Sequence, residues 1–257
     1  MKFTQTATLV MLATLLIGCA AGGNFVSVDR KFRDTVPASG VHHVKRGETL
    51  YAIAWTYGID YRQLASANSI YSPYTIYPGQ KIRVDGRKNT TSVAVNSSAS
   101  KTTPSPSVVQ SAPTSSATVP AYTPPKESND ATPTWKWPAN GRLIAQYSST
   151  KPVNKGIDIA GSMGESIFAA TAGTVVYAGQ GLRGYGNLVI VKHNDTYLSA
   201  YAHASRILVS EQEIVKVGQK IAEIGSTGTD KVMLHFEIRQ NGKPVDPLQY
   251  LPKRTGG

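Results

Sequence analysis

Two short segments of the chain carry side chains that could do chemistry together. Asp158 follows a glycine turn in the segment 154–158, and His235 lies far along the chain in the strand-like segment 233–236. Aspartate and histidine are both zinc ligands, and ligands from distant parts of a chain commonly meet in a fold. A hydrolytic zinc site needs three protein ligands, an open position for water and a general base. The two residues supply only part of that set.

The positions where the remaining groups would be useful hold other residue types. Asn154 lies four residues before Asp158, where a third ligand would be useful, and a neutral amide is a poor zinc ligand. Met233 lies two residues before His235, and a thioether cannot act as a general base. The rest of the chain must therefore decide whether this is an enzyme or only the scaffold of one.

The elements that position these residues belong to a chain of 257 residues, which is long enough for one or two domains with a buried core. Its net charge of +11 indicates an anionic neighbour, such as the cell wall or an acidic membrane surface. Nucleic acid is not expected as a partner. The basic residues are scattered, and the sequence has no helix-turn-helix, zinc-finger or aromatic RNA-binding signature.

The N-terminal residues predict export and lipid attachment. Residues 1–18 contain an apolar run that is too short to span a bilayer but suits a signal peptide. Cys19 is the single cysteine, and a lone cysteine is more often a buried thiol. Its position favours another role, because 16–19 resembles the bacterial lipobox, whose cysteine is acylated and becomes the mature N-terminus. With Ala20 next to it, the resemblance implies a lipid anchor in the outer membrane, facing the periplasm. Residues 19–40 are expected to form a tether.

Residues 41–85 predict a small α+β module with the order strand, helix, helix, strand. Apolar residues at helical spacing follow the turn 47–49 and continue until Gly58, and Asp60 with Gln63 predicts a capping box for a second helix. The segment resembles a LysM module in register from end to end. The matching residues are Val44, 47–50, Ile53, Ala54, Gly58, Leu64, Asn68 and 76–82.

A LysM module implies binding to N-acetylglucosamine in peptidoglycan glycan strands. The implied glycan-binding residues are Gly47, Glu48, Thr49, Leu50, Tyr74, Ile76, Tyr77 and Pro78. Aromatic faces with a polar edge suit an amphipathic sugar, but tyrosines also fill the core and rim of a small domain. The core is favoured for Tyr51 and Tyr57. The two interpretations are equally open for Tyr71, Tyr74 and Tyr77.

The remainder of the chain divides by composition. Residues 86–134 are dominated by serine, threonine and proline. They predict a disordered linker, because they cannot bury enough apolar surface to offset their conformational entropy. In 135–252, many short apolar runs separated by glycine and asparagine turns predict an all-β domain. Residues 253–257 are expected to form a tail.

One glycine-rich segment of the all-β domain needs a separate interpretation. Residues 179–186 have the glycine spacing of a nucleotide-binding loop, but a β-branched strand follows where a helix is needed. We therefore expect a hairpin loop, on which Arg183 and Tyr185 face a partner. Among the histidines, His42 is expected to face solvent and His193 to have a structural role.

The all-β segment resembles the lysostaphin-type (LytM) zinc endopeptidases, which cut peptidoglycan cross-bridges. The resemblance is carried by 156–159, 169–175, 184–187, 201–203, 217–221, 225–228 and 234–237. It implies that Asp158 and His235 keep two zinc-ligand positions and that His203 keeps a catalytic position. Asn154 stands at the third ligand and Met233 at the second catalytic histidine. Losing a ligand weakens zinc binding, and losing a general acid or base costs roughly 10²–10⁴-fold in rate. We therefore expect no metal, no cofactor and no catalytic residue.

The order of lipobox, LysM module, linker and degenerate LytM-type domain resembles the NlpD-type murein hydrolase activators. This implies a non-enzyme, enriched at the division site, that activates periplasmic N-acetylmuramoyl-L-alanine amidases to split septal peptidoglycan. The implied amidase-binding groove comprises Asn154, Asp158, Arg183, Tyr185, His203, Met233 and His235. Two alternatives stay open, a residual zinc endopeptidase and a wall-anchoring protein whose C-terminal domain is inert.

Overall fold

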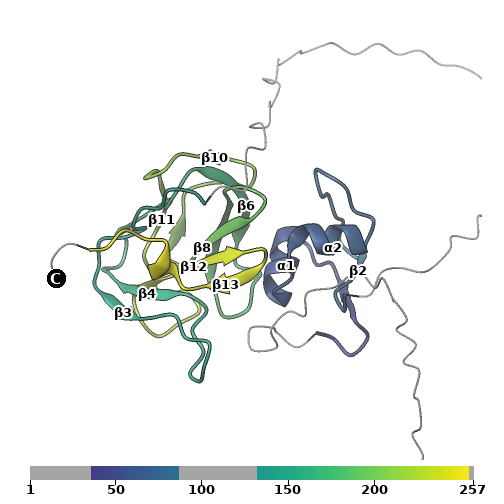
Figure 1. Ribbon diagram of the computed structural model, residues 1–257, viewed down its shortest axis with the longest axis horizontal. Coiled ribbons are helices and arrows are strands. Elements are labelled where there is room, and N and C mark those ends of the chain that lie inside the picture. The colour runs from purple at the N-terminus through teal and green to yellow at the C-terminus, as the bar shows by residue number, and fades with distance from the viewer. Residues whose placement is uncertain (1–35, 87–131, 255–257) are drawn as a thin grey trace, which may run out of the picture.

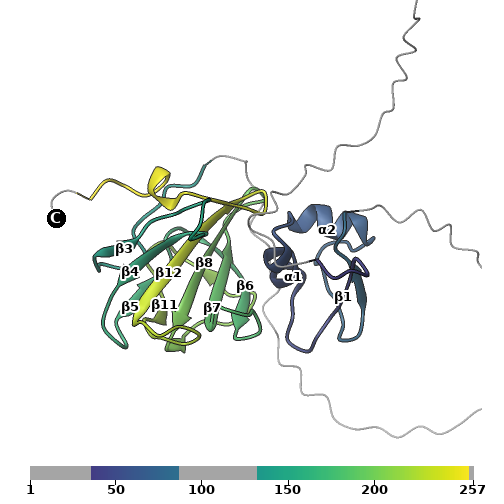
Figure 2. The same ribbon diagram turned by 90° about the horizontal axis from the view of Figure 1, so that it is seen from below.

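The structure, a computed structural model, describes residues 36–86 and 132–254. The predicted signal peptide, Cys19 and most of the predicted tether and linker lie outside the described residues. Within the two described ranges, no helix is long and apolar enough to cross a membrane. These ranges form a small helical module and a larger β domain, which lie side by side (Figure 1, Figure 2).

The small module consists of two short strands and two helices. β1 (Val41–His43) pairs with β2 (Lys81–Arg83) in antiparallel register, and α1 (Leu50–Tyr57) and α2 (Tyr61–Ala67) come between them in the chain. The predicted order of strand, helix, helix, strand is therefore confirmed.

Local capping residues set the ends of both helices. Thr49 accepts a hydrogen bond from the Ala52 N–H at the start of α1, and Gly58 ends this helix at φ 61°, a left-handed conformation that glycine adopts without steric cost. Asp60 caps α2 by accepting from the N–H groups of Arg62 and Gln63. Its carboxylate also binds the Arg62 guanidinium, with Nε 3.2 Å from Oδ1, so this cap includes an ion pair that the predicted capping box did not.

The β domain is built from short strands, as predicted, with no α-helix between residues 132 and 254. Its elements are β3 (Leu143–Ala145), β4 (Ile157–Ala160), β5 (Ser166–Phe168), β6 (Gly173–Gly179), β7 (Asn187–Lys192), β8 (Tyr197–Ala204), β9 (Arg206–Ile207), β10 (Ile214–Val215), β11 (Lys220–Glu223), β12 (Met233–Gln240), β13 (Lys243–Val245) and the 3₁₀ turn η2 (Pro247–Gln249). The large sheet has the order β10-β6-β7-β8-β12-β4-β3, with β13 paired to β12, and the small sheet has the order β5-β11-β9. Both are antiparallel at every pairing.

The core of the β domain joins the two sheets. Ile167 on β5 and Ile221 on β11 share one buried cluster with Val189 and Val191 on β7 and Phe236 on β12. Burial of such apolar side chains is the main favourable contribution to folding. The core therefore holds β12 and its neighbours in a fixed register, on which the candidate site depends.

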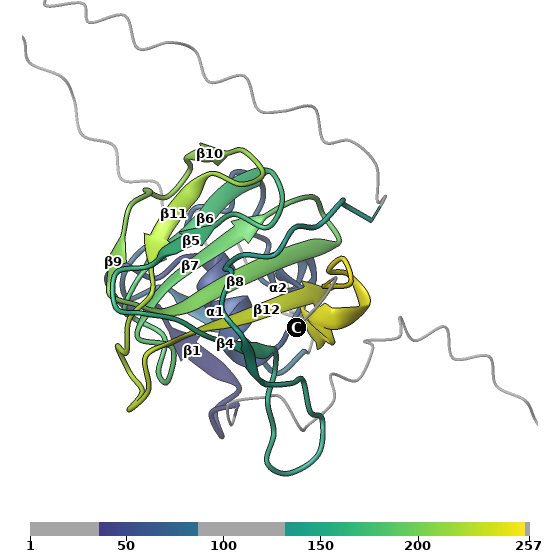
Figure 3. The same cartoon turned by 90° about the vertical axis from the view of Figure 1, so that its left-hand side faces the viewer.

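The other face of the large sheet is covered by the small module. Leu188 and Ile190 alternate with the core valines along β7, and they share a second buried cluster with Ile53 and Trp55 of α1. Successive strand residues point to opposite faces, so β7 is buried on both. Figure 3 shows α1 and α2 behind β8 and β12. The two modules, which we expected a disordered linker to join, are thus packed together.

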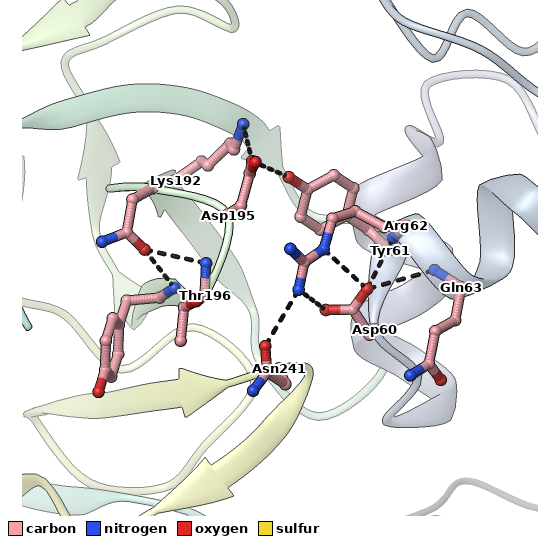
Figure 4. A network of polar contacts seen from close by, with 10 residues as sticks. Asp60, Tyr61, Arg62, Gln63, Lys192, Asp195, Thr196 and Asn241 are labelled. Atoms are coloured by element: carbon pink, nitrogen blue, oxygen red, sulfur yellow. Dashed lines mark hydrogen bonds and ion pairs between the residues drawn. The ribbon is translucent and has the colours of Figure 1, made fainter. Parts of the chain in front are cut away.

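Polar side chains surround this contact between the modules. The Tyr61 hydroxyl donates to Asp195 Oδ1 over 2.7 Å, and Asp195 also pairs with Lys192 Nζ at 2.8 Å. Arg62 Nη2 donates to Asn241 Oδ1 over 3.0 Å (Figure 4). Residues from α2 thereby meet two different turns of the β domain.

Candidate partner-binding groove

Strand register brings Asp158 and His235 together. The two residues are directly opposite each other on β4 and β12, and His235 Nδ1 lies 2.6 Å from Asp158 Oδ1. Residues directly opposite in an antiparallel pair have neighbouring side chains. The structure therefore places side by side the two residues with which the sequence argument began.

A second carboxylate, Glu237, lies on the other side of the same imidazole. It follows His235 by two residues on β12, so both side chains are on one face of the sheet. His235 Nε2 is 3.2 Å from Glu237 Oε1, and Glu237 is completely buried. Burial disfavours the imidazolium, but hydrogen bonds with Asp158 and Glu237 and their charges outweigh it and raise the pKa of His235 to about 9.

Glu237 is itself held in the ionised form. Its burial favours the neutral acid, but the Arg239 guanidinium and His235 outweigh that and lower its pKa to about 2. Arg239 Nη2 lies 3.0 Å from Glu237 Oε2, and the Tyr185 hydroxyl donates to Oε1 over 2.7 Å. Our sequence reasoning missed both Glu237 and Arg239. The signal was available, because three ionisable residues alternate with Leu234, Phe236 and Ile238 along this strand.

His203 lies beside this pair at the end of β8. Its ring centroid is 6.0 Å from that of His235, and its backbone has a φ of 63°, which is uncommon for histidine. Nδ1 donates to the Thr227 carbonyl over 2.8 Å, so in the neutral ring Nε2 carries the lone pair. Burial lowers the pKa of His203, which favours this neutral form.

Asn154 and Met233 lie on the segments that lead into β4 and β12. The Asn154 backbone pairs with Ser148, and its side-chain oxygen accepts from the Gly156 N–H over 3.2 Å, which stabilises the turn before β4. Met233 is half-buried at the first position of β12, opposite Ala160. Met233 is therefore two residues from His235 on the same face of β12, whereas the amide oxygen of Asn154 is engaged in its own turn.

The glycine-rich segment is the loop between two antiparallel strands, β6 and β7, so the predicted hairpin is confirmed. Arg183 is exposed on this loop. Tyr185 is half-buried, with its hydroxyl on Glu237 and its ring centroid 6.2 Å from that of His235. The loop thus carries an exposed cation, Arg183, and an aromatic ring, Tyr185, that is held beside His235.

The residues implied in glycan binding differ in exposure. Tyr77 is 68% exposed, and Gly47 and Pro78 are also exposed. Leu50 is buried in the module, whereas the Thr49 hydroxyl donates to the carbonyl oxygen of Val176 in the β domain over 3.1 Å. The contact between modules therefore uses one end of the loop that the LysM resemblance assigns to glycan.

The remaining residues implied in glycan binding also differ in exposure and contacts. Glu48 is bound by the Lys45 N–H and by His42 Nε2 at 2.7 Å, which makes the expectation of a solvent-facing His42 wrong. Tyr74 packs edge-on against Tyr51 and Tyr61, and Ile76 is half-buried. Tyr57 is buried, as expected, while Tyr71 is exposed.

We expect the stability of the protein to fall as pH rises from 7 to 9. The folded state holds the proton of His235 with a pKa of about 9 against 6.5 for ordinary histidine, so it binds more protons than the unfolded chain. The contribution of His235 to the free energy of unfolding is fully present below pH 6.5 and is lost as pH rises through 9. About 2 kcal/mol of it is lost between pH 7 and 9. Urea unfolding at a series of pH values measures it. His235→Gln should flatten the slope, and His43→Gln, at an exposed position of β1, should not.

Two family models match the chain. The LysM domain model matches residues 42–85, and the Peptidase family M23 model matches residues 152–247. In the described residues, no three histidine, cysteine, aspartate or glutamate side chains are grouped so as to hold a metal ion.

Full-length relatives extend this similarity over nearly the whole chain. The "Lipoprotein NlpD/LppB homolog" of Pseudomonas aeruginosa is 51% identical over 95% of this chain and 90% of its own length. The "Uncharacterized lipoprotein YgeR" of Escherichia coli is 44% identical over 95% of this chain and 91% of its own length. The "Murein hydrolase activator NlpD" of the same organism is 42% identical over 84% of this chain and 69% of its own length. The chain belongs to the NlpD/LppB family of lipoproteins.

Proposed function

We propose that this protein is a non-catalytic activator of periplasmic N-acetylmuramoyl-L-alanine amidases, which split septal peptidoglycan during cell division. The observation that carries the proposal is the arrangement around His235, in which Asp158 and Glu237 both bind the imidazole. Asp158 and His235, which hold two zinc-ligand positions in the LytM resemblance, are hydrogen-bonded to each other. Relatives that are named murein hydrolase activators support this proposal.

The residues present do not fit a resident zinc ion. His235 bonds Asp158 through Nδ1 and Glu237 through Nε2, so a metal ion would have to replace the proton of one of these hydrogen bonds. Asn154, at the third ligand position of the LytM resemblance, is a neutral amide whose oxygen accepts from Gly156. No step of the proposed mechanism therefore uses a metal.

Activation then acts through binding. The groove formed by Asn154, Asp158, Arg183, Tyr185, His203, Met233 and His235 docks the amidase and displaces the element that blocks its active site. A binding partner shifts such an equilibrium by its difference in affinity for the two states of the amidase. Exposed Arg183 and half-buried Met233 offer the amidase a cation and an apolar contact.

The remaining segments hold the activator in place. A lipid on Cys19 anchors the chain to the periplasmic side of the outer membrane, and the LysM module binds glycan strands through the exposed residues Gly47, Tyr77 and Pro78. Relatives named as lipoproteins and as an outer membrane antigenic lipoprotein support the anchor. Together the two attachments would enrich the activator where septal wall is exposed.

Release of soluble fragments from dye-labelled sacculi tests the proposal. The purified chain should be inactive alone and should stimulate at least one amidase of the cell. Met233→Glu, which places a charge in the groove, should remove most of the stimulation. Ile214→Glu makes the same change at an exposed position of β10 and should retain it. Stimulation of none of the amidases would reject the proposal.

The alternative function is a residual zinc endopeptidase, and the Peptidase family M23 match favours it. It requires near one equivalent of bound zinc and cleavage of muropeptides that Asp158→Ala abolishes. A third possibility, an inert C-terminal domain, requires that deletion of residues 135–257 leaves cell separation unchanged. Zinc content and cell separation therefore distinguish the three functions.

A further inference from the structure

The LysM module covers the same face of the large sheet that carries the candidate groove. His235, Glu237 and Arg239 alternate along β12 and so share one face. His235 faces Asp158 at the groove, whereas Arg239 contacts Trp55 of α1. Along this row, Glu237 lies between His235 at the groove and Arg239 at the docked module.

Arg239 divides its hydrogen bonds between the two modules. Nη1 donates to the backbone oxygen of Trp55 over 2.6 Å, and the guanidinium carbon lies 3.6 Å from the centroid of the Trp55 ring. Nε and Nη2 bind Glu237 Oε2 at 3.1 and 3.0 Å, and Nη2 donates to the Tyr185 hydroxyl over 3.3 Å. Arg239 is 1% exposed and Trp55 is 2% exposed. Docked α1 therefore supplies the hydrogen bond of Nη1 and the aromatic face, while the β domain supplies the other contacts of the planar guanidinium.

Glu237 continues this contact into the groove. Its other oxygen, Oε1, accepts from the Tyr185 hydroxyl and lies 3.2 Å from His235 Nε2. A completely buried carboxylate needs its cationic partner, because an unpaired charge away from water is costly. A change in the position of Arg239 must therefore move or neutralise Glu237, and with it His235 and Asp158.

We propose that Trp55 and Arg239 are positioning residues of the groove, so that the docked LysM module is a structural part of the activator as well as its attachment to the wall. Docked α1 holds Arg239, Arg239 holds Glu237, and Glu237 sets the position of the His235 ring beside Asp158. This inference rests on the proposed function only for its effect on amidases. The positioning itself concerns the side chains of this chain alone.

The apolar part of the contact explains why the module stays docked. Leu188, Ile190 and Ala200 of the sheet are buried with Ile53 and Trp55 in one cluster that spans both modules. Undocking would expose these side chains and Arg239 to water together. The modules are therefore expected to separate rarely, and the groove to keep one geometry.

The test uses the full chain with ¹⁵N-labelled histidine. Arg239→Met and Trp55→Leu should each shift the ring ¹⁵N resonances of His235. Those of His193, whose ring nitrogens bind the Ala172 carbonyl and Ser199 Oγ at 2.8 Å, should stay in place and report an intact fold. Tyr61→Phe is the matched control, because it removes a hydrogen bond of the same interface that does not lead to the groove.

The same variants are then titrated against the amidase. Arg239→Met and Trp55→Leu should raise the concentration for half-maximal stimulation roughly 5–150-fold, the usual range of coupling between sites. Tyr61→Phe should leave it unchanged. Arg239→Lys keeps the charge but loses the planar fork, so it should restore the His235 resonances only in part.

The outcomes separate the two proposals. If Arg239→Met does not fold, Trp55→Leu on α1 and Arg239→Lys on β12 still test whether this contact positions the His235 ring. Folded variants whose His235 resonances equal those of the unaltered chain would overturn the positioning role. If the unaltered chain stimulates no amidase, the proposed function fails, while the resonances still decide whether the LysM module positions the groove.

Discussion

Replacing Glu237 by alanine is expected to lower the free energy of unfolding by about 3–5 kcal/mol, because it leaves Arg239 buried without its anionic partner. It also removes the acceptor of the Tyr185 hydroxyl and one of the two carboxylates that bind His235. The midpoint of thermal unfolding should fall by roughly 10 °C. Calorimetry of the unaltered chain and of Glu237→Ala measures the free energy and the midpoint of unfolding.

Glu223→Ala is the matched control for this substitution. Glu223 also binds two cationic side chains, Arg206 and Lys220, with distances of 2.9 and 2.8 Å. These pairs are at the surface, where water and salt screen them, so their loss should change stability little. Equal effects of Glu237→Ala and Glu223→Ala would show that burial does not decide the strength of the Glu237 contacts.

Glu237→Ala should also change the titration of the groove. Without the charge and hydrogen bond of Glu237, the pKa of His235 should fall toward the ordinary histidine value, since Asp158 alone would oppose its burial. The decrease in stability between pH 7 and 9 should become smaller for the same reason. An NMR titration of the His235 ring in Glu237→Ala and in the unaltered chain checks this directly.

The LysM module could be predicted closely because its elements are specified by local residues. Gly58 ends α1 and Asp60 caps α2 whatever the rest of the chain does. The packing of this module on the β domain depends on residues more than a hundred positions apart, such as Trp55 and Arg239. The composition of 86–134 predicted a disordered linker and says nothing of this packing. The extent of that linker stays a prediction, since residues 87–131 lie outside the described part of the chain.

A signal for the packed interface was nevertheless present in β7. Its run Leu188 to Val191 is apolar at every position, which is typical of a strand with both faces covered. A β domain standing alone would have polar residues at alternate positions of such a strand.

Only part of the candidate site could be predicted from the sequence. The resemblance placed Asp158 and His235 together, but Glu237 was treated as part of a motif and not as a buried partner that needs Arg239.

Replacing Gly156 by alanine is expected to separate β4 from β12 at the groove. A Cβ at this position would lie 2.1 Å from the carbonyl oxygen of Phe236 and 2.8 Å from its carbonyl carbon, and a backbone atom within a sheet cannot move aside as a flexible side chain can. The cost should reach about 3 kcal/mol, at the upper end for overpacking. Because Asp158 follows two residues later, its contact with His235 should be lost and amidase stimulation with it.

Gly164→Ala provides the control for that substitution. Gly164 has a φ of 84° and open space around its Cα, so alanine there has only the backbone strain of a left-handed residue, about 1–2 kcal/mol, and no collision. It should retain stimulation in full. If Gly156→Ala also retained stimulation, the close approach of β4 to β12 would not matter for the groove, and the amidase would have to bind elsewhere on the domain. Loss of stimulation in Gly156→Ala alone, with the fold intact by the His193 resonances, would assign the docking surface to the strand pair that holds Asp158 beside His235.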